Sequence, residues 1–407
     1  MASFSIALSG LTAASSDLDV TANNVANANT IGFKGSRAEF ADVYASGAVN
    51  LNTSVVGEGV RLATTAQQFT QGNITTTSSN LDLAISGDGF FTLKDSSGYV
   101  YSRNGQFQEN SSGNVISSTG QALQVYPPLV NGGFNTGTLT DLNLQTAQSA
   151  PLATSSGSVI LNLPANSTAP AVTPFDPTNS QTYNQSTSTT VYDSLGNAYP
   201  ATFYFAQTAT PNQWNAYLTV NGTQVGTAQT LTFSPTGAVS APAGGALSFN
   251  GYTPPGGANP MNLTFNFANT TQYGAQFGVT SITQNGYATG QLSTVSIDTA
   301  GVVSAVYTNG RSTQLGQLAM ANFPNPQGLK QLGDTNWSET FTSGNVVQGT
   351  AGSAGFGTIQ SGALEASNVD LTTQLVNMIT AQRAFQANAQ VITTANQLSQ
   401  TVINIGH

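Results

Sequence analysis

The sequence predicts a mainly β protein with an α-helix at each end, and three observations support this prediction. Between about residues 62 and 356, short alternations of apolar and polar residues are separated by turns rich in glycine and asparagine. Both ends instead carry apolar residues at steps of three and four, which is the spacing of an amphipathic helix. The 407 residues exceed the length of one ordinary compact domain, so we expect more than one domain.

The first helix is expected over about residues 4–27, where no proline interrupts the chain. Its apolar residues form a heptad-like stripe in which Ser15 and Ala22 fill two positions with small side chains. The large residues of this stripe are Phe4, Leu8, Leu11, Leu18 and Val25. Asn27 and Gly32 are residues typical of the end of a helix.

The second helix is expected over about residues 368–404. Ser367 as N-cap and Asp370 three residues later resemble a capping box. Negative charge on Glu365 and Asp370 would complement the dipole at the start of this helix. The apolar stripe consists of Leu371, Leu375, Met378, Phe385 and Ile392, and after a slip it resumes at Leu398, Val402 and Ile405.

Neither helix is expected to be stable alone, because both are short of the Glu–Lys pairs that support isolated helices. Each therefore needs a partner. Two arrangements remain open: the helices pack together in one domain, or they are chain ends that order only on polymerisation.

The middle of the chain is expected to be β-structure throughout. Asn-Gly dipeptides, a strong hairpin signal between strands, begin at Asn104, Asn131, Asn221, Asn250, Asn285 and Asn309. Residues 214–220 read as a strand before one of these turns, and residues 263–267 alternate apolar and polar side chains. Proline-rich stretches at 164–177 and 235–260 are expected to be a connector between domains and long exposed loops.

The composition excludes several kinds of partner. Charged residues make up 6% of the chain, against roughly 25% in an average soluble protein, and the net charge is −9. No lysine or arginine occurs between Arg103 and Arg311, so we expect neither nucleic acid nor anionic membrane as a partner. Residues 1–16 do not resemble a secretory signal peptide, and no stretch approaches the roughly 20 apolar residues of a membrane span.

Catalytic chemistry is not expected either. The chain has no cysteine, and its single histidine is the last residue, His407, so disulfides and the common zinc sites are excluded. Asp17 and Asp19 point to different faces of a helix. The Gly87-Asp88-Gly89 segment lacks the spacing of a phosphate loop, and no Gly-x-Ser-x-Gly elbow is present. We therefore expect no cofactor, no metal and no enzyme activity.

The two ends carry long ordered motifs. The first comprises Ser9-Gly10-Leu11, Asn23-Asn24-Val25-Ala26-Asn27 and Thr30-x-Gly32-Phe33-Lys34; the second runs from Gly362 through Glu365, Ser367, Asn368 and Asp370 to Leu371. Together they resemble the terminal signatures of the flagellar rod and hook proteins. The residues that carry this resemblance are Asn23, Asn24, Asn27, Gly32, Phe33, Glu365, Ser367, Asn368 and Asp370.

Within that family, three features favour the hook branch over a distal rod protein. The chain is longer than expected for a distal rod protein, residues 191–197 resemble a hook-specific stretch, and residues 318–323 resemble the return through an inner β-domain. An extracellular adhesin remains a weaker alternative, because a polar β-rich insert could hold a ligand. A free-standing adhesin, however, would need its own secretion signal and no matched terminal helices.

The resemblance implies a nested architecture of two β-domains with an N- and C-terminal helical coiled coil. The implied parts are a coiled-coil domain of residues 1–28 and 365–407, a linker of 29–70, an inner β-domain of 71–145 and 286–358, an inserted outer β-domain of 146–285, and a return linker of 359–364. In this arrangement the apolar stripes of the two helices would pack subunits together around a central channel.

The resemblance also implies a function and a location. The chain would be an extracellular subunit that self-assembles into a curved hollow tube, a universal joint between rod and filament. Implied partners are further copies of the chain, the distal rod protein, the hook cap protein, the hook–filament junction protein and the flagellar type III export apparatus. Export would occur without a cleaved signal peptide.

Overall fold

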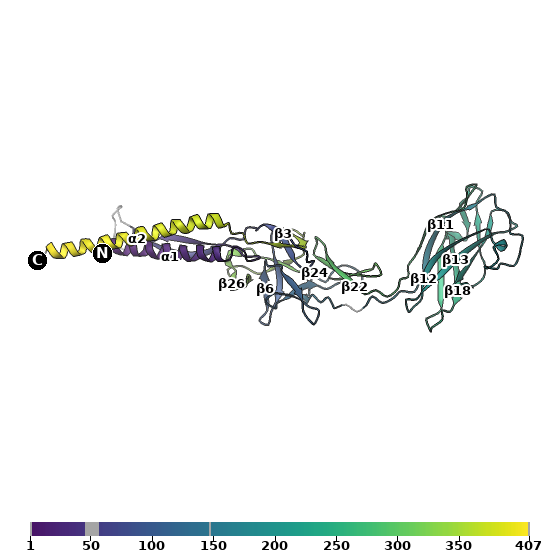
Figure 1. Ribbon diagram of the computed structural model, residues 1–407, viewed down its shortest axis with the longest axis horizontal. Coiled ribbons are helices and arrows are strands. Elements are labelled where there is room, and N and C mark those ends of the chain that lie inside the picture. The colour runs from purple at the N-terminus through teal and green to yellow at the C-terminus, as the bar shows by residue number, and fades with distance from the viewer. Residues whose placement is uncertain (1, 45–56, 146–147, 406–407) are drawn as a thin grey trace. The chain divides into compact units, whose positions relative to one another are not determined.

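The computed structural model describes residues 2–44, 57–145 and 148–405, and it divides into two compact units (Figure 1). The terminal unit comprises Met1–Thr146, Thr294–Ala305 and Thr313–His407; the inserted unit comprises Ala147–Ser293 and Val306–Ser312. His407 and the side chains of Val402 and Ile405 lie outside the described part. The predicted class, mainly β with a helix at each end, is confirmed.

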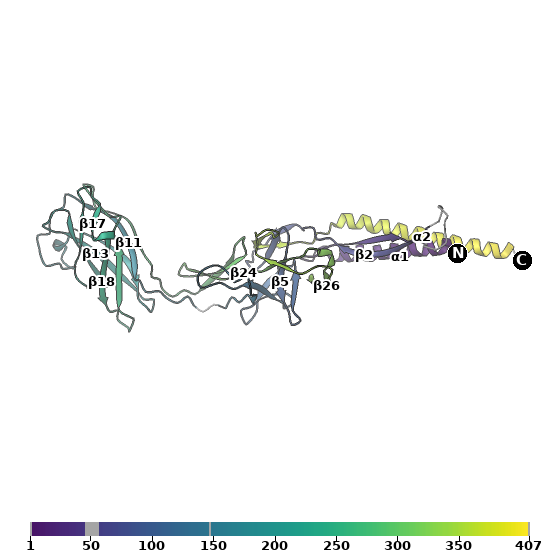
Figure 2. The same cartoon turned by 180° about the vertical axis from the view of Figure 1, so that it is seen from behind.

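The two long helices are α1 (Ala2–Ala26) and α2 (Leu371–Ile405), within three residues of the predicted bounds. They lie side by side in both views of the molecule (Figures 1 and 2). The amide of Asn24 donates to Gln374 at 3.3 Å, whereas Gly10 faces Asn388. Residues early in α1 therefore meet residues late in α2, so the pair is antiparallel.

A hairpin of β1 (Ser36–Asp42) and β2 (Val60–Gln67) packs on α1. Its residues lie in the segment 29–70 that was expected to be a linker. The return segment is also strand: β29 (Thr358–Ser361) pairs with β4 (Leu83–Ser86), and β30 (Ala363–Glu365) pairs with β3 (Ile74–Thr76). The described strands of both segments thus satisfy their backbone groups by sheet hydrogen bonds.

The largest sheet has 13 strands, with a main path of β22-β23-β24-β9-β5-β6-β27-β26. The strands of this sheet are β5 (Phe90–Lys94), β6 (Tyr99–Ser102), β7 (Phe107–Glu109), β8 (Val115–Ser117), β9 (Ala122–Tyr126), β10 (Thr140–Asp141), β22 (Leu292–Ile297), β23 (Val302–Tyr307), β24 (Ser312–Leu318), β25 (Met320–Asn322), β26 (Lys330–Gly333), β27 (Asn336–Ser338) and β28 (Val347–Gly349). A short 3₁₀ turn, η3 (Pro326–Gly328), precedes β26.

Two clusters of buried side chains support this sheet. The larger one gathers aliphatic residues such as Leu93, Val125 and Val303 around Phe91. The smaller one is aromatic: Phe90 lies edge-on to Trp337 at 5.7 Å between ring centroids, and Phe69 lies edge-on to both.

The inserted unit is a sandwich of two sheets, ordered β18-β19-β11-β20 with β21 beside β11, and β12-β13-β14-β16-β17 with β15 beside β14. Its strands are β11 (Ser156–Pro164), β12 (Gln185–Tyr192), β13 (Ala198–Gln207), β14 (Gln213–Val220), β15 (Thr223–Gln224), β16 (Gln229–Phe233), β17 (Val239–Ala241), β18 (Ala246–Tyr252), β19 (Met261–Asn266), β20 (Thr271–Tyr273) and β21 (Gly278–Gln284). Two 3₁₀ turns, η1 (Ser180–Thr182) and η2 (Ala243–Gly245), lie in its connections.

One apolar core lies between the two sheets of this sandwich. Phe203 from β13 contacts Phe265 from β19 edge-to-face at 4.9 Å between centroids, and both rings are fully buried. Trp214 and Leu218 of β14 face the same core. The predicted hairpin at Asn221-Gly222 is present between β14 and β15, with positive φ angles of 50° and 77° as a type I′ turn requires.

Candidate functional site

The helix pair is held together by small side chains. Ala7, Ala14 and Thr21 of α1 are 3–7% exposed and recur every seven residues, and Ala381 of α2 is 3% exposed. At Gly10 an added Cβ atom would lie 2.7 Å from the Asn388 side-chain oxygen, so a larger residue there would displace the Asn388 side chain. Small residues along this face let the two helices approach closely.

The predicted α1 stripe lies beside this contact face instead of forming it. Phe4 and Leu8 are 41% and 47% exposed, while Leu11, Leu18 and Val25 are half-buried. Large apolar side chains usually mark the buried face of a helix, but within one subunit they lie beside the face that meets α2. Their packing between subunits stays a prediction. The buried residues of α1 are Ala7, Ala14, Thr21 and Asn24, none of which is a large apolar residue.

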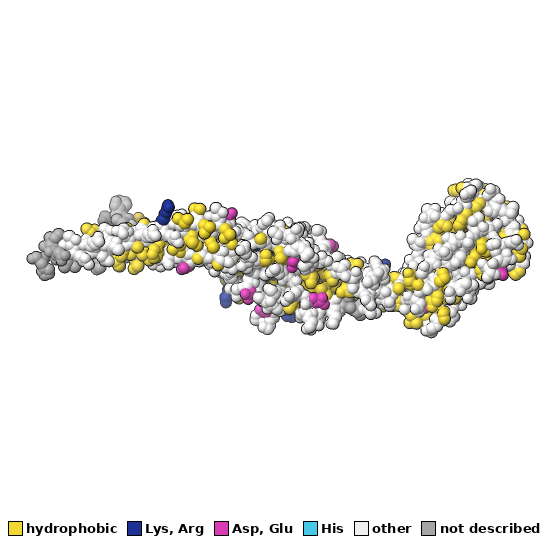
Figure 3. Space-filling view, viewed as in Figure 1, with side chains coloured by type: hydrophobic (Ala, Val, Ile, Leu, Met, Phe, Trp, Pro, Cys, Tyr) yellow, Lys and Arg dark blue, Asp and Glu magenta, His cyan; other side chains and the backbone are white. Residues whose placement is uncertain are grey.

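The predicted α2 stripe divides between two faces. Met378, Phe385 and Ile392 are half-buried and share a helix face with Ala381. Leu371 and Leu375 are 45% and 49% exposed, and Val376 and Ile379 beside them are exposed as well. In Figure 3 apolar side chains gather on the surface of the helix pair, where charged side chains are few. The subunit alone therefore leaves apolar helix surface uncovered.

Beneath the helix pair lies a buried ion cluster around Glu365. Its carboxylate accepts hydrogen bonds from Lys34 Nζ at 2.6 Å, from Arg103 Nη1 at 3.2 Å and from the backbone N–H of Gly72 at 2.8 Å. The Glu365 side chain is fully buried. The interpretation of Glu365 as a charge near the helix start is wrong, because the residue belongs to β30 and its carboxylate neutralises buried cations.

The two cations of this cluster are tied to the backbone as well. Lys34 Nζ donates to the Thr70 carbonyl and Arg103 Nη2 to the Gly87 carbonyl, both at 2.8 Å. Burial lowers the pKa of Lys34 and of Arg103, and the adjacent Glu365 carboxylate offsets part of each fall. The cluster joins segments from the start, the middle and the end of the chain.

Two asparagines of the terminal motifs, Asn24 and Asn368, bind backbone groups of other segments near this cluster, and we call these two side chains the clamps. The Asn24 side chain accepts from the Ser36 N–H at 2.8 Å and donates to the Ser36 carbonyl at 2.7 Å. The Asn368 side chain accepts from the Gly35 N–H at 2.8 Å and donates to the Gln68 carbonyl at 2.7 Å. Each amide thus satisfies a donor and an acceptor of a distant segment.

Gly32 and Phe33 complete the junction. Gly32 has a φ of +70° and donates its N–H to the Glu365 carbonyl at 2.8 Å; an added Cβ atom would lie 2.5 Å from the Asn104 nitrogen. Phe33 is 7% exposed, and its carbonyl accepts from the Asn368 N–H. These positions need their residue types for backbone conformation and close packing.

The remaining motif residues cap the helices. Asn27 Nδ2 donates to the Asn23 carbonyl at 3.0 Å at the end of α1. At the start of α2 the N-cap is Asp370, whose carboxylate accepts from the Thr373 N–H at 2.7 Å and whose pKa this bond lowers. The prediction of Ser367 as N-cap is wrong: its hydroxyl accepts from the Val369 N–H within a turn before the helix.

From the sequence, Lys34 was placed in the first terminal motif and Arg103 was named only as one end of the stretch without lysine or arginine, and neither residue was given a role. A usable signal was their rarity: the chain has 8 lysines and arginines in all, and Lys34 lies in an ordered terminal motif. A basic residue retained beside glycine and aromatic residues in such a chain is a reasonable candidate for a buried ion pair.

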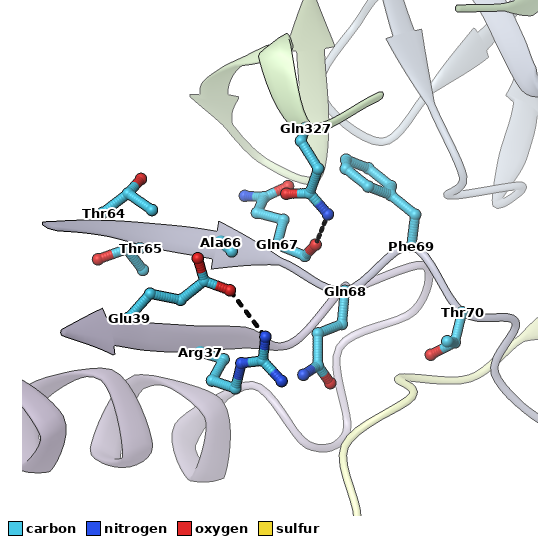
Figure 4. Close-up of a pocket in the computed structure, with 10 residues that line it drawn as sticks. All are labelled: Arg37, Glu39, Thr64, Thr65, Ala66, Gln67, Gln68, Phe69, Thr70 and Gln327. Atoms are coloured by element: carbon cyan, nitrogen blue, oxygen red, sulfur yellow. Dashed lines mark hydrogen bonds and ion pairs between the residues drawn. The ribbon is translucent and has the colours of Figure 1, made fainter. Parts of the chain in front are cut away.

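A cavity of about 580 Å³ lies beside the β1–β2 hairpin (Figure 4). Arg37 and Glu39 of β1 form an exposed ion pair of 2.7 Å on its wall. Gln327 donates to the Gln67 carbonyl across it at 2.5 Å, and half-buried Phe69 adds an aromatic wall. The described residues contain no group of three or more possible metal ligands, and none of the described helices is long and apolar enough to cross a membrane.

Four family models match successive parts of the chain. They are "Flagella basal body rod protein" (residues 4–34), "Flagellar hook protein FlgE/F/G D1 domain" (84–169), "Flagellar basal body protein FlaE D2 domain" (162–287) and "Flagellar basal body rod FlgEFG protein C-terminal" (360–405). The ion cluster and the clamps thus lie largely within or next to the matched terminal segments.

Full-length relatives decide between rod and hook. The chain is 42% identical to the flagellar hook protein FlgE of Escherichia coli (strain K12), over 99% of both chains. It is 40% identical to that of Salmonella typhimurium over 99% of this chain and all of that one, and 33% identical to that of Borreliella burgdorferi over 98% of each. The crystal structure of Helicobacter pylori flagellar hook protein FlgE2 shares the fold, with a TM-score of 0.51 and 13% identity, covering 72% of this chain and all of that one. The chain belongs to the flagellar hook protein family and is a structural subunit of the bacterial flagellar hook.

Proposed function

We propose that the chain polymerises with copies of itself into a curved hollow tube, a flexible universal joint that carries torque from rod to filament. The observation that supports this proposal is the apolar helix surface that the subunit leaves uncovered, with Leu8, Leu371 and Leu375 each at least 45% exposed. Burying one such side chain contributes about 1.5–3 kcal/mol, so a few of them per contact can hold a polymer together.

In this proposal the parts of the chain divide the work. Residues 1–28 and 365–407 form the axial core and pack against the same parts of neighbouring copies. Residues 29–70 and 359–364 connect that core to an inner β-domain of residues 71–145 and 286–358. Residues 146–285 form the outer domain, which meets the outer domains of neighbours.

The outer contacts are proposed to slide while the axial core stays locked. Residues 147–293 of the inserted unit lie in the stretch between Arg103 and Arg311 that has no lysine or arginine in its interior. Contacts made of serine, threonine, asparagine and glutamine are individually weak and readily exchanged through water. Lys–Glu pairs introduced across these contacts should therefore stiffen isolated hooks, and an unchanged bending stiffness would contradict sliding.

The proposed partners are the distal rod protein at the base, the hook cap and hook–filament junction proteins at the tip, and the flagellar type III export apparatus. The proposed location is extracellular, with delivery through the growing structure and no cleavage of a signal peptide. N-terminal sequencing of subunits from isolated hooks tests that last point, since a processed terminus would refute it.

Electron microscopy of basal bodies from a strain lacking this gene tests the assignment as a whole. A complete rod with its rings and no hook is the expected result. A shortened rod would place the subunit one segment further inward, and intact flagella would overturn the structural role altogether.

A further inference from the structure

Phe341 stands apart from every other exposed aromatic residue in the described part of the chain. Its side chain is 102% exposed, whereas the other exposed aromatic side chains there range from 40% to 63%. Single exposed apolar residues are common on protein surfaces and need no explanation by themselves. A phenylalanine with no burial at all is a different case, because the folded chain gains nothing from it.

The loop that carries Phe341 is ordered by hydrogen bonds on both sides of it. The Thr340 hydroxyl donates to the Gly328 carbonyl at 2.5 Å, and the Thr340 N–H donates to the Ser343 hydroxyl at 2.9 Å. Asn325 donates to the Thr342 carbonyl at 3.0 Å. Ser343 is fully buried.

Close packing beneath this loop reinforces that order. An added Cβ atom at Gly328 would lie 2.4 Å from the Ser343 nitrogen. The fold therefore holds this aromatic side chain out in solvent on a pre-ordered turn, which lowers the entropy cost of docking it.

The same unit contains a cavity that could bind this side chain on another copy, the cavity beside the β1–β2 hairpin (Figure 4). Its walls are set by bonds independent of any partner: Gln67 accepts from Gln327 through its backbone and from Trp337 Nε1, at 2.6 Å, through its side chain. Phe69 lines the cavity, and at about 580 Å³ the cavity is large enough for a phenyl ring.

Charge also matches between the loop and the cavity. Glu339 is exposed two residues before Phe341, and Arg37 lies on the cavity wall with its side chain 66% exposed. Arg37 already pairs with Glu39, but a guanidinium has five N–H donors and can accept a second carboxylate. Besides Arg37, Glu39, Ala66 and Phe69, the cavity is lined by threonine and glutamine, which can form hydrogen bonds without charge.

We infer that Phe341 of one copy inserts into the hairpin cavity of a second copy, with Glu339 beside the Arg37 of that copy. Phe341 and the cavity are different surfaces of one chain, so the contact between two copies is heterologous. Such a contact can repeat from copy to copy into an open helical array instead of closing as a dimer. The inference rests on the proposed self-assembly and names one of its contacts.

Cysteine cross-linking tests the contact directly, because the natural chain has no cysteine. Hooks are isolated from cells that make Phe341→Cys and Thr65→Cys proteins together, and then oxidised. A disulfide dimer is expected, and it can only form between copies. The control mixture pairs Thr65→Cys with Val130→Cys, because Val130 is also fully exposed, at 104%, and should give no dimer.

Phe341→Ser provides an independent measurement on the full chain. It should raise the subunit concentration needed for polymerisation by about tenfold or more, while Val130→Ser leaves it unchanged. Normal polymerisation of Phe341→Ser without cross-linked dimers would overturn this contact but leave the proposed function intact. In a third protein that carries Phe341→Cys and Thr65→Cys together, a disulfide within single chains would equally overturn it. Absence of any polymer from the natural chain would instead refute the proposed function.

Discussion

The two units of this subunit are stabilised in different ways. The inserted unit encloses a dense aromatic core between two sheets, including Phe203, Phe265 and Trp214, each fully buried. The terminal unit relies at its helical end on polar ties between distant segments, with Glu365, Lys34 and Arg103 at their centre. All three ion pairs found among the described residues belong to the terminal unit.

This difference shows which part of the chain buries its large apolar side chains within one subunit and which part leaves them exposed. A core that buries its large apolar side chains can fold without help. The helix pair instead buries alanine and threonine and leaves leucine exposed, so within the subunit it gains little from burial of large apolar side chains. If neighbouring copies cover the helices as proposed, we expect the ion cluster to hold the end of α1 and the start of α2 in register before they do so.

The largest expected effect comes from removing the centre of the ion cluster. Glu365→Ala leaves the Lys34 and Arg103 cations buried without a counterion, which should lower the free energy of unfolding of the terminal unit by about 3–5 kcal/mol. Hydrogen exchange read separately for the two units is the measurement, and the inserted unit should be unchanged. Glu39→Ala, which removes the exposed Arg37 partner, is the matched control and should cost at most about 1 kcal/mol.

A second substitution should destabilise the inserted unit and leave the terminal unit unchanged. Leu218→Ala deletes a fully buried side chain between the two sheets and should cost that unit about 2–5 kcal/mol through lost burial and a residual cavity. The terminal unit should keep its exchange protection, as followed in the same experiment. Equal loss of protection in both units would show that they unfold together and would undo the comparison.

Leu375→Asp separates folding from assembly. Because Leu375 is 49% exposed in the subunit, the unfolding free energy should change by no more than about 0.5 kcal/mol. Polymerisation should be lost, since a charge would replace an apolar contact worth about 1.5–3 kcal/mol in each copy. Thr380→Asp on the same helix is the control, because Thr380 is exposed and polar, and sedimentation of assembled material measures both.

Patterns of residues predicted the elements of the fold well. Residues 214–220 before Asn221-Gly222 became a strand and a type I′ hairpin, because local turn chemistry determined that geometry. Asn250-Gly251 did not form a hairpin turn. It lies inside β18, at the point where the register against β19 shifts. Pairing with a neighbouring strand there outweighed the local turn preference.

The candidate site was less predictable, since its parts are long-range. Nothing local indicates that Glu365 pairs with Lys34, 331 positions earlier in the chain. The motif resemblance identified these segments, yet their chemistry depends on burial that only the folded chain reveals. The same reason explains why the face of α1 buried against α2, at Ala7 and Ala14, was missed: close approach of two helices favours small residues, which carry no strong apolar signal.

The smallest expected effect concerns the N-cap of α2 and has a defined pH dependence. The Thr373 N–H bond lowers the pKa of Asp370 from its ordinary value of 3.8, so the folded state binds this proton more weakly than the unfolded state does. The stabilisation is therefore present above pH 3.8 and is lost as the pH falls through the lower folded value. Asp370→Asn should largely keep the cap, because an asparagine side chain also accepts at this position, but without that pH dependence.

Helix content followed by circular dichroism during acid titration measures this effect. The difference between the natural chain and Asp370→Asn should appear only below about pH 4, where the natural carboxylate becomes protonated. Parallel titrations of the two proteins would contradict Asp370 as the cap and return that role to Ser367. Asp370 lies five residues after Glu365. If combining Asp370→Asn with Glu365→Ala lowers the unfolding free energy by more or less than the sum of the two single changes, the cap and the ion cluster stabilise the start of α2 cooperatively.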